Sequence, residues 1–265
     1  MSTLRALPTM LRVGLAESVA YRAEMLVWML TMTMPLVSLA LWSSIAAEAP
    51  VGRFTSEAFA SYFLAALVVR QLTSSWVVWQ MNMEIRSGAL SRRLLKPVHP
   101  MLAYAAENVG AMPLRAAICV PLVAVAVFFA GAGASLPSSP LVWAAWLVSL
   151  VGAWAIGFAM MTLIGALAFV IESSTSVFEV WQLSFAFLSG YLLPLELFPP
   201  AVRAVTDVLP FRYMVSFPVE TILGMLAPAE VARQLAIQWG FVAVMGALAV
   251  WAWRLGLRRF GAFGG

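Results

Sequence analysis

The residues from Met25 to Ala47 include no charged side chain, and this run constrains the fold more than any other feature of the chain. An apolar helix of that length crosses the roughly 30 Å hydrocarbon core of a bilayer at about 1.5 Å per residue. Pro35 lies inside the run and predicts a kink, which bilayer helices tolerate when neighbouring groups satisfy the freed carbonyl. We therefore interpret the run as a first membrane span.

The composition supports the same class for the whole chain. Hydrophobic residues make up 63% of the sequence and charged residues 11%, whereas soluble domains hold roughly 25% charged residues. A soluble fold of this size needs more polar surface than the sequence contains, so we predict an all-α membrane protein with six transmembrane helices. The predicted spans cover residues 25–47, 58–83, 111–130, 141–171, 174–193 and 234–253.

Two segments outside the spans have their own patterns. In residues 1–24, Leu4, Leu7, Leu11 and Leu15 recur at helical spacing, which predicts an amphipathic helix lying on the membrane surface. A disordered basic tail is the alternative for residues 1–24. Residues 25–265 are predicted to form a single transmembrane domain. Residues 196–230 are interrupted by prolines, and we interpret them as a re-entrant hairpin of short helices before the sixth span.

Basic residues gather on one side of the predicted topology. The first set is Arg5, Arg12, Arg22, Arg86, Arg92, Arg93, Lys96, Arg254, Arg258 and Arg259, and the opposite set is Arg53, Arg203, Arg212 and Arg233. The positive-inside rule places both termini and the loop after the second span in the cytoplasm. The net charge of +4 is explained by this orientation, and we predict no nucleic-acid partner because the basic residues do not form one patch.

Arg70 lies near the middle of the second predicted span. A charge at the bilayer centre costs about 2.5–3.5 kcal/mol on insertion scales, so such a residue faces protein or water. Gln71 and Ser74 extend this polarity, and Gln182 and Ser189 give the fifth span a polar side as well. Two interpretations stay open for Arg70: a cation in a substrate path, or a structural charge paired with a neighbouring helix.

The docking stretch, Glu84–Pro100, reads EIRSGALSRRLLKPVHP and separates two long apolar blocks. Its polar and apolar residues alternate at helical spacing, which predicts an amphipathic helix over residues 84–96 that continues directly from the second span. We interpret this helix as a docking site for another protein, in which Gly88 allows a bend or a close approach. A helix that rests on anionic lipid headgroups is the alternative.

Motifs for chemistry are absent from the sequence. There is no GxxxxGK[ST] loop, and the single lysine, Lys96, lies outside any glycine-rich phosphate loop. One histidine and one cysteine are too few for a His-rich zinc site, and neither HExxH nor GxSxG occurs. We therefore predict no catalytic residue, no metal site and no cofactor bound by this chain, which is not an enzyme by itself.

The docking stretch resembles the IRxGxLxxxLLKPxxP signature of small bacterial permeases of the type-2 exporter class of ABC transporters, and SGYLLPLELFP resembles their span-five ending. The order of parts is similar over nearly the whole chain. The resemblance implies a permease in the bacterial cytoplasmic (inner) membrane, paired with a second copy or a related chain. It also implies separate ATPase subunits, in two copies, that bind ATP and Mg²⁺ and drive outward movement of an amphipathic, lipid-like or drug-like substrate by alternating access.

In such a permease, residues 84–96 are a coupling helix that enters a groove on the ATPase. The predicted ATPase contacts are Glu84, Arg86, Gly88, Leu90, Arg92, Arg93, Leu94, Leu95 and Lys96, with Glu172 and Glu179 as a second contact. The predicted substrate path is lined by Arg70, Gln71, Ser74, Gln182 and Ser189. A carrier or membrane scaffold that works without a motor is the alternative function; inverted repeats would favour a carrier, and none is visible.

Overall fold

A computed structural model describes residues 3–20, 27, 34–130, 137–171 and 174–260. Helices dominate these residues, and the β pairing found among them is one isolated bridge between Val51 and Phe54. The prediction of an all-α chain with several apolar helices is confirmed.

The described helices follow one another with short connections. In chain order they are α1 (Thr3–Ala20), α3 (Met34–Glu48), α4 (Ser56–Thr73), α5 (Val77–Arg86), α6 (Leu90–Leu94), α7 (Pro100–Gly110), α8 (Met112–Ala130), α9 (Pro140–Ala166), η1 (Leu167–Phe169), α10 (Ser174–Leu188), η2 (Leu195–Leu197), α11 (Pro200–Val208), η3 (Pro210–Met214), α12 (Ser216–Ile222) and α13 (Pro228–Phe260).

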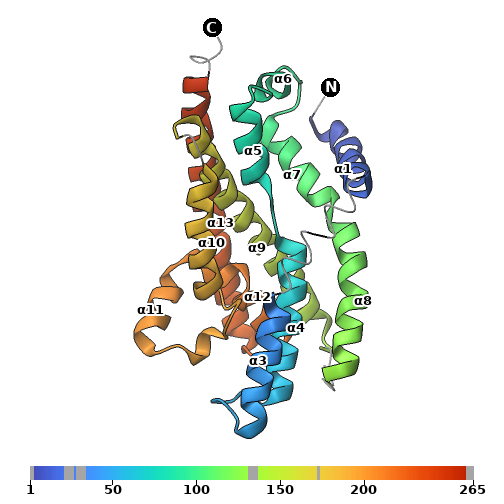
Figure 1. The fold of residues 1–265 in the computed structure, drawn as a ribbon, viewed down its shortest axis with the longest axis vertical. Helices are drawn as coiled ribbons and strands as arrows, with labels where there is room; N and C mark the ends of the chain where they lie inside the picture. The colour runs from blue at the N-terminus through green and yellow to red at the C-terminus, as the bar shows by residue number, and fades with distance from the viewer. Residues whose placement is uncertain (1–2, 21–26, 28–33, 131–136, 172–173, 261–265) are drawn as a thin grey trace.

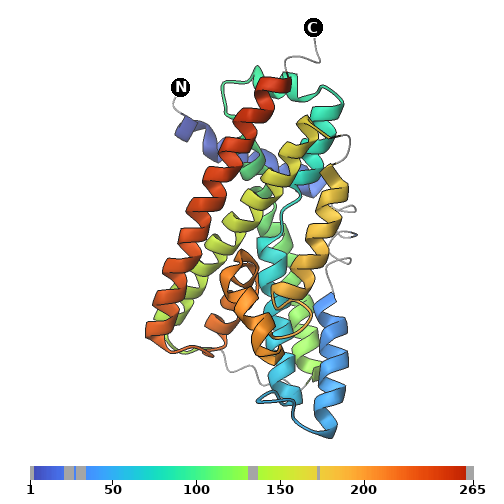
Figure 2. The ribbon, with the colours of Figure 1, turned by 90° about the vertical axis from the view of Figure 1, so that its left-hand side faces the viewer.

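The helices form an elongated bundle with α9 near its centre. Helix α9 packs against α13, α5, α4 and α12. Helices α1 and α6 and the C-terminal end of α13 lie at one end of the bundle, whereas the connection between α3 and α4 lies at the other (Figures 1 and 2). We call the first of these the α6 end. The arrangement brings α1 and the end of α13 to the same end, as an even number of spans would.

Three helical segments among the described residues are long and apolar enough to cross a membrane. They are Pro100–Val125, Pro140–Phe169 and Pro228–Phe260. The first joins α7 and α8 and begins well before the predicted boundary at residue 111. Helix α3 covers the second part of the predicted first span, and the earlier part lies almost wholly outside the described residues. The count of six spans therefore stays a prediction.

The second predicted span is interrupted. Helix α4 ends at Thr73, Ser74 has an extended backbone (φ −65°, ψ 144°), and α5 begins only at Val77. The expectation of one continuous helix from this span into the docking stretch is wrong. Serine side chains offer the backbone hydrogen bonds that compete with a helix, and Ser75 Oγ accepts one from the Val77 N–H at 3.4 Å.

The region predicted as a re-entrant hairpin, residues 196–230, consists of the short elements α11, η3 and α12, flanked by η2 and the start of α13. Phe217 and Val219 of α12 are fully buried, and α12 packs against both α4 and α9. Protein therefore covers the α12 part of this region, which is the condition for having irregular backbone at membrane depth.

Candidate functional site

The docking stretch forms the tip of the α6 end (Figure 1). Helix α5 stops at Arg86, Gly88 turns the chain with φ +74°, and the short helix α6 follows. A left-handed backbone strains any residue with a side chain, so glycine is needed at this turn. The predicted helix over residues 84–96 is thus two helical pieces joined by a bend, as the presence of Gly88 allowed.

Part of the docking stretch faces outward. Leu95 is 86% exposed and Leu94 is 38% exposed, and the cationic side chains of Arg86, Arg92 and Lys96 are exposed beside them. Leu90 is fully buried and belongs to the core. Its side chain is therefore not available to a partner in this structure, because the bend at Gly88 turns the first residue of α6 inward.

Arg93 and Glu84, both predicted to contact an ATPase, are occupied with each other. The Arg93 guanidinium donates to Glu84 through Nε at 2.9 Å and Nη2 at 2.6 Å, and through Nη1 to Glu107 of α7 at 2.7 Å. Tyr104 donates to Glu84 at 2.7 Å, and its ring lies 4.3 Å from the Arg93 guanidinium carbon. Burial would lower the pKa of Arg93, but its hydrogen bonds with the two carboxylates outweigh this and raise it.

These contacts define an Arg93 cluster, made of Glu84, Arg93, Tyr104 and Glu107. It joins α5, α6 and α7 through charge-assisted hydrogen bonds. The sequence reasoning missed Tyr104 and Glu107, although a carboxylate in the apolar residues 101–130 was itself a signal.

The second predicted cytoplasmic contact lies beside α5. Ser174, the first residue of α10, donates from its N–H at 3.3 Å and from its Oγ at 3.0 Å to Asn82 Oδ1 of α5. Glu179 is exposed on α10. Glu172 lies outside the described residues.

Arg70 is buried and faces the fifth predicted span. Its guanidinium carbon lies 4.7 Å from the Phe185 ring centre and 6.0 Å from that of Tyr191. Gln71, Ser74 and Ser189 are buried as well, whereas Gln182 is exposed on α10. The structure therefore brings the second and fifth predicted spans together at Arg70 but leaves Gln182 outside this contact.

Arg115 of α8, which the sequence reasoning did not single out, lies at the interruption of the second span. Its Nη1 donates to the Ser74 carbonyl at 2.6 Å and to Ser74 Oγ at 2.8 Å, and its guanidinium carbon is 4.3 Å from the Trp76 ring centre. Asn108 Oδ1 accepts the Trp76 N–H at 3.3 Å. Arg70 was recognised in the sequence because it is a lone charge inside an apolar run. Arg115 is also a lone charge inside an apolar run, so the same reasoning could have identified it.

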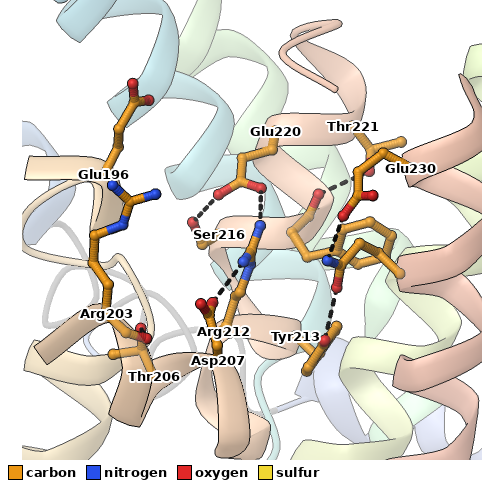
Figure 3. A network of polar contacts seen from close by, with 12 residues as sticks. Glu196, Arg203, Thr206, Asp207, Arg212, Tyr213, Ser216, Glu220, Thr221 and Glu230 are labelled. Carbon is orange, nitrogen blue, oxygen red and sulfur yellow. Dashed lines mark hydrogen bonds and ion pairs between the residues drawn. The ribbon is translucent and has the colours of Figure 1, made fainter. Parts of the chain in front are cut away.

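A separate polar network lies around α11, η3 and α12, away from the α6 end (Figure 3). Arg212 donates to Asp207 of α11 at 2.8 Å and to Glu220 of α12 at 2.9 Å, and Ser216 donates to Glu220 at 2.7 Å. Tyr213 donates to Gln234 Oε1 at 2.7 Å, and Gln234 donates to Glu230 at 2.7 Å. These bonds fix the short elements to one another and to the start of α13.

A cavity of about 460 Å³ opens between α4, α8 and α9. Its lining is mainly apolar, with Trp143 and Trp146 on α9. The contributing α4 residues, Ala58, Ser61, Leu64, Ala65 and Val68, recur on one helical face. Arg70 points elsewhere because it follows Val68 by two positions.

Comparison with known proteins identifies the family. A family model described as "ABC-2 family transporter protein" matches residues 30–264. No curated protein matches the chain significantly. The match spans every described element from α3 to α13, and it agrees with an all-α architecture rich in apolar helices. The chain therefore belongs to the ABC-2 family of transporter proteins and is a membrane transport component of that family.

Proposed function

We propose that this chain is the permease subunit of an ATP-driven exporter and that separate ATPase subunits bind its docking stretch. The observation that carries the proposal is the pairing of exposed Leu94 and Leu95 with exposed Arg86, Arg92 and Lys96 at one tip of a membrane-family bundle. An apolar ridge bordered by cations suits a groove with acidic rims. ATP and Mg²⁺ then belong to the ATPase subunits, and this chain catalyses nothing itself.

The Arg93 cluster supports a route for movement away from the ATPase. A push on α6 reaches α5 through Glu84 and α7 through Glu107, because one guanidinium holds both carboxylates. Helix α7 continues nearly directly into α8. This route replaces the continuous second-span helix, which the break at Ser74–Trp76 excludes.

The wider proposal follows the resemblance. Two permease chains, identical or related, enclose a path between the second and fifth spans, and an amphipathic, lipid-like or drug-like substrate moves outward by alternating access. The α6 end lies in the cytoplasm of a bacterial cell, under its cytoplasmic membrane. Arg70, Gln71, Ser74 and Ser189 are all buried, and Arg70 lies over Phe185 of the fifth predicted span, which supports a place beside the path. Gln182 contributes from the exposed side of α10, where a second permease chain could pack.

The docking proposal is tested with the double variant Leu94→Asp/Leu95→Asp, co-expressed with the candidate ATPase. We expect membrane insertion to persist, co-purification of the ATPase to be lost, and substrate-stimulated ATP hydrolysis to disappear, because two carboxylates in an apolar contact repel the acidic rim.

The matched control is Val205→Asp/Val208→Asp on α11, which replaces two exposed apolar residues far from α6. It should retain the ATPase. Normal hydrolysis and co-purification in the Leu94/Leu95 variant would exclude docking at this stretch.

A further inference from the structure

Two arginines in the bundle lack the carboxylate partners that other inward-facing arginines have. Arg93 and Arg212 are half-buried, and each forms ion pairs with two carboxylates. Arg70 and Arg115 are more deeply buried, at 9% and 2% exposure, and neither has an ion pair within the part of the chain that the structure describes. Buried charge is costly unless it is compensated.

The groups that contact the two guanidinium side chains are neutral, so they do not compensate the positive charges. Arg70 lies over Phe185 and Tyr191, and Arg115 lies over Trp76 and donates to the two Ser74 oxygens. Nη2 of Arg115 is buried and has no hydrogen-bond partner among the described residues. Both arginines lie at the same interruption of the second predicted span, because Ser74, which accepts from Arg115, donates its own N–H to the Arg70 carbonyl at 3.1 Å. Together they form a region of uncompensated positive charge with one N–H group still to be satisfied.

The surroundings of Arg70 are polar at one side and apolar at the other. A small cavity of about 10 Å³ adjoins Arg70, Thr73 and Ser75, and apolar side chains such as Met161, Phe185 and Met214 line the rest of it. This volume holds about one water molecule. A larger group enters only after the second and fifth spans separate, as alternating access requires.

We propose that Arg70 and Arg115 bind the anionic headgroup of an amphiphilic substrate, a phosphate, sulfate or carboxylate, while the apolar and aromatic wall contacts its tail. This inference rests on the proposed transport function and narrows its substrate class. Arginine suits the task because its planar fork donates two parallel hydrogen bonds to such oxyanions. A neutral or cationic headgroup would leave the two charges uncompensated.

The test measures binding to the full-length chain in phosphatidylcholine nanodiscs, without any ATPase. The probes are dodecyl phosphate, dodecyltrimethylammonium and inorganic phosphate. We expect dodecyl phosphate to bind at least about tenfold more tightly than the cationic probe, since one charge-assisted hydrogen bond is worth that factor. Inorganic phosphate should bind weakly because it lacks a tail. Equal affinity for inorganic phosphate and dodecyl phosphate would indicate a free-ion site and overturn the amphiphile assignment.

Variants separate headgroup binding from a structural role. Arg70→Gln and Arg115→Gln should each weaken dodecyl phosphate binding about tenfold and leave the cationic probe unchanged or improved, while Arg70→Lys should retain part of the affinity. Arg203→Gln removes an exposed charge on α11 and should change neither probe. An equal loss for both probes, or no loss, would overturn the inference.

Transport is measured separately in proteoliposomes that contain the permease and its ATPase. ATP-dependent movement of any amphiphile without preference for anions would leave the transport function standing and reject the headgroup site. Selective anion binding in nanodiscs with no ATP-dependent movement would support the site and reject the exporter.

Discussion

Arg93 shows that a charge in a docking stretch can have an internal task. Its guanidinium joins the end of α5, the whole of α6 and the middle of α7 through Glu84 and Glu107. Its neighbour Arg92 is exposed. Two adjacent arginines of the same motif therefore have different roles, one facing inward and one facing a partner.

We predict that Arg93→Gln lowers stability by about 1–3 kcal/mol, because the two carboxylates lose their shared cation. It should also reduce the stimulation of ATP hydrolysis by substrate, since α6 is no longer tied to α5 and α7. Thermal unfolding in detergent and ATPase assays on the complex measure these effects. Arg92→Gln should stay within about 0.5 kcal/mol of the parent in stability, so similar melting shifts in both variants would contradict the assignment.

Sequence reasoning at the residue scale succeeded where a single charge stood out from its surroundings. Arg70 was recognised because it interrupts an apolar run, and its burial against the fifth predicted span agrees with a face directed into the bundle. The inward direction of Arg93 and Leu90 depends on the bend at Gly88. Helical periodicity alone assumes that no such bend exists, so it put both residues on the docking face.

At the scale of elements, the interruption between α4 and α5 is the feature that the sequence concealed. Neither proline nor glycine occurs in Ser74–Trp76, and the apolar pattern continues on both sides. Ser75 gives the break local support through the Val77 N–H, and the other supporting groups come from elsewhere in the chain: Asn108 from α7 and Arg115 from α8. A break supported by tertiary contacts leaves little trace in local sequence.

We predict that Asn108→Leu destabilises the protein by about 1–3 kcal/mol, because it leaves the Trp76 N–H without its acceptor inside the bundle. Asn108 is fully buried and also donates to the Tyr104 carbonyl at 2.9 Å. The melting temperature in detergent measures the loss. The control Gln182→Leu also replaces an amide by leucine, but at an exposed position on α10, and it should change the melting temperature little. A comparable drop in melting temperature in the control would show that the buried amide of Asn108 has no special role.

At the scale of the whole molecule, the order of the helical segments could be predicted better than the interruptions within them. Short helices were expected before the last span, and α11, η3 and α12 lie there. Helix α8 lies at the position of the third predicted span, residues 111–130, but α7 precedes it with only Ala111 between them. The apolar helical segment therefore begins at Pro100, and its polar residue Asn108 accepts the Trp76 N–H at the break between α4 and α5. Composition and charge distribution are enough to predict a bundle of membrane helices, whereas contacts between helices determine where each helix ends.

The orientation of the bundle can be tested by cysteine labelling. The single native cysteine, Cys119, is buried and is replaced by alanine as the background. We predict that Leu95→Cys reacts with a membrane-impermeant maleimide only after the cells are permeabilised, while Val208→Cys reacts in intact cells. Both side chains are well exposed: Leu95 directly follows α6 at one end of the bundle, and Val208 ends α11, which lies in the other half (Figure 1). Labelling of Leu95→Cys in intact cells would show that the α6 end lies outside the cell, opposite to the predicted orientation.

The break between α4 and α5 also affects how the protein fits its bilayer. A straight helix meets a thinner or thicker bilayer by tilting as a whole or by deforming the lipid around it. Two segments joined by the non-helical residues Ser74–Trp76 can change the angle between them, so their combined height changes while each keeps its own packing. We therefore expect the second predicted span to adjust to membranes of different thickness without moving α6 relative to α7.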